Sequence, residues 1–201
     1  TTYESRARAV WQHGGNPIYK DYRTTSVTSY LVDSGQVSKT VYGFDGGADF
    51  NLQTDVYEYD FGAGQPGSFV RRSHTVYERS ATYTQDSVNL LNLPTETWVS
   101  SDLAGNMKVS RTRYEYDNYV SDQNHAPLVD RVNITGRATG FGTTFGSRGN
   151  VTKMTSFADA LNQTGGVSVY TQYDIAGNVV KTIDGKGSPT TISYTDNFGG
   201  A

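Results

Sequence analysis

Short runs that alternate apolar and polar residues fill most of the chain, and clusters of Gly, Asp, Asn and Pro separate them. Ser26 to Val32 alternates loosely, Asp33-Ser34-Gly35 follows as a turn, and Val37 to Phe44 returns. A period of two residues is typical of a strand with one buried face, and a glycine-containing turn between two such runs predicts a β-hairpin. We therefore expect a hairpin over residues 26–44.

The stretch from Tyr173 to Tyr194 shows the same arrangement with two turns. Branched residues from Val179 to Ile183 favour a pleated, half-buried surface, and Thr190 to Tyr194 is expected to return beside them. Asp and Gly three residues apart suit a tight turn, because Asp accepts hydrogen bonds from the amides ahead of it and Gly adopts positive φ without steric cost. This pair occurs at Asp174 and Gly177, where Asn178 extends the turn, and again at Asp184 and Gly187.

Two short motifs recur, and repetition is the strongest signal in the sequence as a whole. One is an aromatic residue, a spacer, a second aromatic residue and Asp, and the other is Gly-Asn before an apolar residue. We predict structural roles for all of these signature residues: Tyr42, Asp45, Tyr57, Tyr59, Asp60, Tyr114, Tyr116 and Asp117 in the first motif; Asp102, Gly105, Asn106, Gly149, Asn150, Gly177 and Asn178 in or before the second; and Tyr173, Asp174, Asp184, Gly187 and Tyr194 in the C-terminal stretch.

The spacing of the motifs is regular only in part. Tyr59, Tyr116 and Tyr173 are 57 residues apart each time, but Tyr42 lies only 15 residues before Tyr57. Each interval is therefore expected to hold two or three hairpins with loops of variable length. The copy at residues 149–150 lacks the Asp found three residues before the other glycines, which leaves its register open.

The order of residues from Tyr173 to Tyr194 (Tyr-Asp, Gly-Asn-Val, Asp and Gly, then an aromatic residue) closely resembles the RHS repeat, also called the YD repeat. The resemblance covers residues 42–60, 102–117 and 149–199. It implies hairpins wound into a continuous spiral sheet, which in bacterial polymorphic toxins forms a hollow shell around a toxic C-terminal domain and in other members serves at the cell surface. The self-cleavage motif of that family, Asp-Pro-x-Gly-Leu, does not occur in this sequence.

We therefore expect an all-β fold, an array of antiparallel β-hairpins forming one repeat region over residues 1–201. Residues 1–23 show no period and are expected to be an irregular lead-in, or a strand that pairs with another part of a longer protein. Residues 24–201 are expected to hold repeats with enlarged loops. A helical turn is expected within residues 86–94. The unfinished unit that begins at Tyr194 leads us to expect that a longer native chain, or a neighbouring subunit, continues the sheet.

Composition narrows the possible partners. The chain of 201 residues has 17 Lys and Arg against 20 Asp and Glu, a net charge of −3, which does not favour nucleic acid. Its 15 Tyr and 8 Phe are typical of β-sheets. Cysteine is absent, which excludes disulfides and thiolate chemistry, and no apolar run approaches the length of a bilayer span.

Candidate chemistry is sparse. Glu58 with Asp60, and Glu115 with Asp117, lie two residues apart and could serve a glycosidase as paired carboxylates. We favour a structural role, with tyrosines stacked across strands and Asp closing each turn, because these pairs recur with the repeat. The histidines at 13, 74 and 125 are far apart, and the Asp-rich loop at 45–49 lacks calcium-loop spacing. No catalytic residue, metal or cofactor is predicted.

The sequence therefore favours a non-enzymatic structural module, extracellular or at the surface of a bacterial cell, that builds a shell or a self-assembling fibre through its open end strands. Its expected partners are further copies of itself or the rest of a longer chain, with an enclosed toxin domain or surface glycans also open. The alternative is a carbohydrate-binding or adhesion module in which Trp11 and Trp98 form a sugar platform, although Trp98 is expected in the core. A third hypothesis is an enzyme that acts on glycosides.

Overall fold

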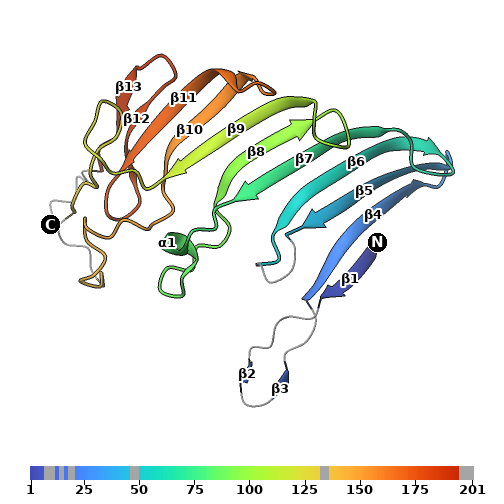
Figure 1. Cartoon of the computed structure of the whole chain (residues 1–201), viewed down its shortest axis with the longest axis horizontal. Coiled ribbons are helices and arrows are strands. Elements are labelled where there is room, and N and C mark those ends of the chain that lie inside the picture. Colours follow the sequence, from blue (N-terminus) through green and yellow to red (C-terminus); the bar gives the residue numbers. More distant parts are fainter. Residues whose placement is uncertain (7–11, 14–15, 18–20, 46–49, 132–135, 195–201) are drawn as a thin grey trace. The chain divides into compact units, whose positions relative to one another are not determined.

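The computed structural model of the chain describes residues 1–6, 12–13, 16–17, 21–45, 50–131 and 136–194 (Figure 1). It is nearly all antiparallel β-structure, with one four-residue helix among the described residues, which confirms the predicted array of hairpins. The elements are β1 (Thr2–Arg6), β2 (Gln12–His13), β3 (Asn16–Pro17), β4 (Asp21–Leu31), β5 (Gln36–Phe44), β6 (Gln53–Ala63), β7 (Phe69–Tyr77), α1 (Ala81–Thr84), β8 (Pro94–Ser100), β9 (Lys108–Tyr116), β10 (Val151–Asp159), β11 (Thr164–Tyr173), β12 (Val179–Ile183) and β13 (Pro189–Thr191).

Eleven strands hydrogen-bond as neighbours in the order β1-β4-β5-β6-β7-β8-β9-β10-β11-β12-β13, while β2 and β3 form a separate pair. From β4 onward each strand therefore pairs with the strands beside it in sequence, as a run of hairpins requires. Two compact units can be distinguished. The first comprises Thr1–Val76, Thr97–Arg111 and Ala160–Asn162, and the second comprises Tyr77–Glu96, Thr112–Asp159 and Gln163–Ala201.

In the first unit, the hairpin expected over residues 26–44 is present as β4 and β5. Its register runs from Ser26 opposite Val41 to Leu31 opposite Gln36. Within the expected lead-in, residues 2–6 form β1, which pairs with β4 of the same chain. The short run shows no alternation in its sequence, and its place depends on a partner strand and on a salt bridge between Glu4 and Arg23.

A small core in the first unit surrounds Trp98, which is only 9% exposed. His74 stacks on its ring with the centroids 4.6 Å apart, and the cations of Arg72 and Lys108 lie 5.1 and 4.8 Å from the ring centre. Gly105 has φ +82°, and a Cβ atom there would lie 2.7 Å from the indole. Glycine is therefore required at this position for both its backbone conformation and its lack of a side chain.

In the second unit, β9 to β13 pair in sequence order. The chain between β9 and β10 makes a short parallel bridge there: Val129 N–H donates to Tyr173 C=O (3.1 Å), and Ile175 N–H donates to Val129 C=O (3.0 Å). Leu128 and Ile175 are buried beside it. The returning strand expected over residues 190–194 is shorter, since β13 ends at Thr191.

The helix of the second unit lies before the segment in which a helical turn was expected. Residues 81–84 form α1, which buries Tyr83 with its ring edge against Tyr116, and residues 86–88 form a turn. Directly before this helix, the carboxylate of Glu78 accepts hydrogen bonds from the backbone N–H groups of Arg79 and Ser80. No helix within the described ranges has the length and apolar character that crossing a bilayer demands.

Candidate functional site

An aromatic residue followed by an acidic residue stands at the end of four strands. The backbone N–H of the acidic residue donates to the C=O of the residue directly before the next strand, and we call this arrangement a strand junction. The four junctions are Phe44-Asp45 with Leu52 (2.9 Å), Tyr77-Glu78 with Leu93 (2.7 Å), Tyr116-Asp117 with Asn150 (2.9 Å) and Tyr173-Asp174 with Asn178 (3.0 Å).

At three junctions the acidic side chain adds a second hydrogen bond to the same partner residue. Oδ1 of Asp45 accepts from the backbone N–H of Leu52 (3.0 Å), and the corresponding distances are 2.9 Å for Asp117 with Asn150 and 2.9 Å for Asp174 with Asn178. An acidic residue and its partner thus exchange two hydrogen bonds, as two directly opposite residues of paired antiparallel strands do. The longer side chain of Glu78 turns to Arg79 and Ser80 instead, and these hydrogen bonds lower the pKa of Glu78.

Strand junctions tolerate very different loops. The segment enclosed by a junction is residues 175–177 at Asp174 and residues 118–149 at Asp117. The copy at residues 149–150, whose register the sequence left open, receives its missing carboxylate from Asp117, which also accepts from the N–H of Gly149 (2.7 Å). The carboxylate at Gly149 and Asn150 therefore comes from a residue that is close in space, whereas Asp102 and Asp174 stand three residues before their own glycines in the sequence.

The tyrosine of the junction closes the base of its hairpin. The hydroxyl of Tyr116 donates to the C=O of Pro94 (2.8 Å), that of Tyr173 to the C=O of Val151 (2.9 Å), and that of Tyr194 to the C=O of Val179 (3.0 Å). Each accepting carbonyl belongs to the first residue of the preceding strand: β8, β10 or β12. At Tyr116 and Tyr173 this bond gives a physical reason for tyrosine, as opposed to another aromatic residue, before the aspartate. Tyr194 makes the same bond outside the four junctions.

Changing Tyr116 or Tyr173 to Phe is expected to lower the free energy of unfolding by about 1 kcal/mol each, because the partner carbonyl loses its hydrogen bond while the ring packing stays. Tyr59→Phe is the matched control, since the structure gives the Tyr59 hydroxyl no hydrogen bond within the described residues. Urea unfolding curves measure the difference. Equal losses in all three variants would contradict the assigned role of the hydroxyls.

Alkaline unfolding provides a second measurement at the Tyr116 junction. Burial, with the nearby charges of Tyr114 and Asp117, raises the pKa of Tyr116 to about 12. The folded state thus holds a proton that the unfolded state releases near pH 10, and the free energy of unfolding is expected to fall between pH about 10 and about 12. The ultraviolet absorbance titration of wild type minus Tyr116→Phe should show one tyrosine ionising near pH 12. A difference centred near pH 10 would contradict this.

The sequence motif around Tyr59 occupies a different position from the junctions. Tyr57, Tyr59 and Asp60 lie inside β6, where Asp60 bonds its neighbour Phe61 (N–H to Oδ1, 2.7 Å) and its backbone N–H reaches Ser68. Tyr42 likewise lies inside β5. The 57-residue spacing therefore compares the middle of one strand with the ends of two others. Sequence reasoning missed the junction at 77–78, which a search for an aromatic residue followed by either Asp or Glu would have found.

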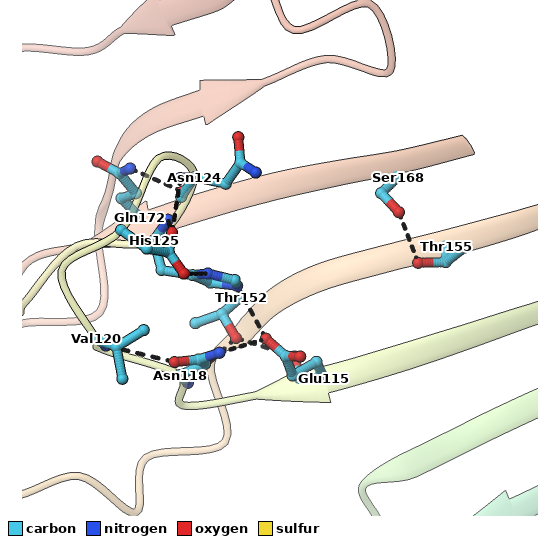
Figure 2. A network of polar contacts seen from close by, with 10 residues as sticks. Glu115, Asn118, Val120, Asn124, His125, Thr152, Thr155, Ser168 and Gln172 are labelled. Carbon is cyan, nitrogen blue, oxygen red and sulfur yellow. Dashed lines mark hydrogen bonds and ion pairs between the residues drawn. The ribbon is translucent and has the colours of Figure 1, made fainter. Parts of the chain in front are cut away.

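A polar network holds the chain after Asp117 onto the sheet of the second unit (Figure 2). Oε1 of Glu115 accepts from Asn118 Nδ2 (3.0 Å) and lies 2.9 Å from His125 Nε2, off the direction of a hydrogen bond. His125 Nδ1 lies 2.8 Å from Oδ2 of Asp122, and hydrogen bonds from the backbone and ring of His125 lower the pKa of Asp122 to about 2. Gln172 bonds the C=O of Asn124 (2.9 Å) and so joins this loop to β11.

The other candidate residues have structural partners. Glu58 forms an ion pair with Arg71, and Nδ1 of His74 lies 2.7 Å from Asp55. No group of three His, Cys, Asp or Glu side chains suited to a metal occurs in the described part of the chain. Two of the tyrosines expected to stack instead meet a neighbouring ring edge to face: Tyr59 contacts Phe69, and Tyr116 contacts Tyr83. Trp98 lies in the core, as expected, whereas Trp11, His13 as a side chain and residues 46–49 lie outside what the structure describes.

Comparisons of the sequence with models of protein families and with curated proteins found no match.

Proposed function

We propose that this chain is a non-enzymatic structural module of the RHS/YD-repeat kind, which builds an extracellular β-sheet shell or a fibre. The strand junctions carry the proposal. At Asp117 and Asp174 the aspartate exchanges two bonds with the residue before the next strand, and the tyrosine beside it bonds the first residue of the preceding strand. These two junctions are alike although they enclose 32 and 3 residues. Such a device suits a protein that lengthens by adding hairpins, because repeat architectures are stabilised mainly by contacts between neighbouring units.

The edges of the strand order support assembly. Among the described strands, β1 and β13 each pair on one side, and an unpaired edge is a template for another strand. Ile192 N–H donates to Val180 C=O, and hydrogen-bonded positions alternate along an antiparallel ladder, so the N–H and C=O of Thr191 point away from β12. The partners in this proposal are further copies of the chain or the rest of a longer one, at the surface of a bacterial cell, with an enclosed toxin domain as possible cargo.

Light scattering and electron microscopy of the purified chain at micromolar concentration test the assembly. Thr191→Pro removes an outward-facing N–H and is expected to weaken association, whereas Ile192→Pro removes a bond inside the β12–β13 pair and should destabilise the hairpin instead. Circular dichroism separates the two effects. A stable monomer whose edge amides are protected from hydrogen exchange would refute the assembly proposal.

A further inference from the structure

The sheet of the second unit separates charged from uncharged side chains between its two faces. Apart from Asp159 at the end of β10, the part of β9 to β13 in this unit contains four charged residues: Arg113, Glu115, Lys153 and Lys181. Successive residues of a strand point to opposite faces, and the strand register places all four on the same face. We call this side the charged face and the opposite side the neutral face.

Three rows of uncharged side chains, each running across neighbouring strands, make up the neutral face. The first two rows are Thr112, Ser156 and Val167, and Tyr114, Met154 and Val169. The third row consists of Thr171, Thr182 and Thr190. Val167 is 54% exposed and Met154 is 38% exposed, and none of the nine side chains is buried. A flat, uncharged surface of the sheet therefore faces outward.

The loop after β9 packs on the charged face. His125 lies 2.9 Å from Glu115 and edge-on to the ring of Tyr170, and Gln172 bonds the C=O of Asn124 (Figure 2). An antiparallel sheet commonly packs its apolar face on the core and turns its polar face to water. In the described part of this unit the charged face is partly covered and the neutral face is not, which is the reverse of that arrangement.

The first unit distributes its charges differently. Asp55 pairs with Arg72 on one face of the hairpin formed by β6 and β7, and Glu58 pairs with Arg71 on the other face. Both faces of that hairpin thus carry charges, as is typical of sheet surfaces in contact with water. The neutral face is therefore a local feature of β9 to β13 and does not follow from the composition of the whole chain.

We propose that the neutral face is an interface at which two copies of this chain pack sheet against sheet. Stacked sheets lie about 10 Å apart and interdigitate the side chains of their facing sides. A twofold contact brings the same surface of both copies together, and a surface without charges meets no like charge in its partner. Six of the nine side chains carry a hydroxyl, which favours a protein partner over lipid chains. The Thr112 and Ser156 hydroxyls, 3.4 Å apart, can bond each other when buried.

The size of the neutral face determines how tightly it can bind. Five strands about 4.8 Å apart and five residues of about 3.4 Å each cover about 24 by 17 Å, or about 400 Å² per copy. A standard interface buries about 800 Å² per partner. We therefore expect a weak, reversible dimer with a Kd of about 10–100 µM. The contact uses a sheet face, so it is independent of the pairing of edge strands.

Sedimentation equilibrium of the whole chain between about 5 and 500 µM measures this dimer. The Thr191→Pro variant serves as the parent, because its end-to-end association is expected to be weakened while its neutral face is intact. Val167→Lys, on the middle strand of the five, should raise the Kd at least about tenfold because like charges then meet across the interface. Ser168→Lys adds the same charge at the next position, on the charged face, and should leave the Kd unchanged within about twofold.

A mixing experiment separates docking from simple damage to the fold. Val167→Glu alone should weaken the dimer as Val167→Lys does, and an equal mixture of the two variants should recover the parent Kd within about threefold, because opposite charges then face each other. Circular dichroism of each variant confirms that the fold persists.

Four results would overturn the inference: a parent that stays monomeric at the highest concentration, equal losses in Val167→Lys and Ser168→Lys, no recovery in the mixture, or a monomeric parent that binds phosphatidylcholine vesicles through this face. The last result would identify lipid as the partner. Larger oligomers of the wild type that Thr191→Pro removes report the pairing of edge strands, so a failure of the neutral face is distinguishable from a failure of end-to-end assembly.

Discussion

Replacing Asp117 with Ala is expected to lower the free energy of unfolding by about 3 kcal/mol, among the largest effects of any single change in the second unit. Its carboxylate accepts from the backbone N–H groups of Arg148 (2.8 Å), Gly149 (2.7 Å) and Asn150 (2.9 Å) and from the Tyr119 hydroxyl (2.6 Å). Alanine leaves all of these donors without their acceptor. Asp117 also has φ +54°, a conformation that Ala adopts at a further cost.

Asp117→Asn separates the two contributions. Asn tolerates the left-handed backbone but offers one acceptor oxygen in place of two, so a loss of about 1–2 kcal/mol is expected. Asp60→Asn is the matched control, because Asp60 belongs to the same sequence motif but, among the described residues, its side chain bonds only the N–H of Phe61. Urea unfolding and hydrogen exchange of amides 148–150 measure the effect. A loss at Asp60 as large as that at Asp117 would show that the motif, and not the junction, matters.

Arg148→Lys is expected to destabilise the loop over residues 136–149 by about 2–3 kcal/mol. The guanidinium donates to four carbonyls: those of Phe141 (2.9 Å), Gly142 (2.8 Å), Phe145 (2.9 Å) and Ile175 (2.7 Å). Lysine keeps the charge, but a single ammonium cannot satisfy the same planar set of acceptors. The loop would then lose its connection to the turn after β11.

Limited proteolysis of the loop and thermal unfolding measure this change. Arg137→Lys is the control: Arg137 lies in the same loop, and its ion pair with Asp130 (3.3 Å) is one that lysine can also make. We expect less than about 0.5 kcal/mol there. Unchanged cleavage in Arg148→Lys would mean that the loop is held by other contacts, such as the one between the tilted rings of Phe141 and Phe145.

Local patterns determined the all-β class, the hairpin over residues 26–44 and the turn role of aspartates. These features depend on neighbours in sequence: alternation sets the buried face of a strand, and an Asp reaches amides two to four residues ahead, as Asp174 and Asp184 do. The sequence by itself therefore identified most of the turns at which hydrogen bonds close.

The tertiary structure decided which residues form the strand junctions. Asp117 bonds Asn150 across 32 intervening residues, and no local pattern reports that distance. Glu78 forms a junction that a motif ending in Asp does not include, and Tyr59 lies inside a strand although its motif matches Tyr116. The entropic cost of closing a loop grows only slowly with its length. The same kind of junction can therefore enclose 3 residues (175–177) or 32 residues (118–149). A search for a fixed spacing between motifs cannot find the junctions for this reason. The partner of edge strand β1 was likewise not visible in the sequence, because pairing with β4, and not its own pattern, makes it a strand.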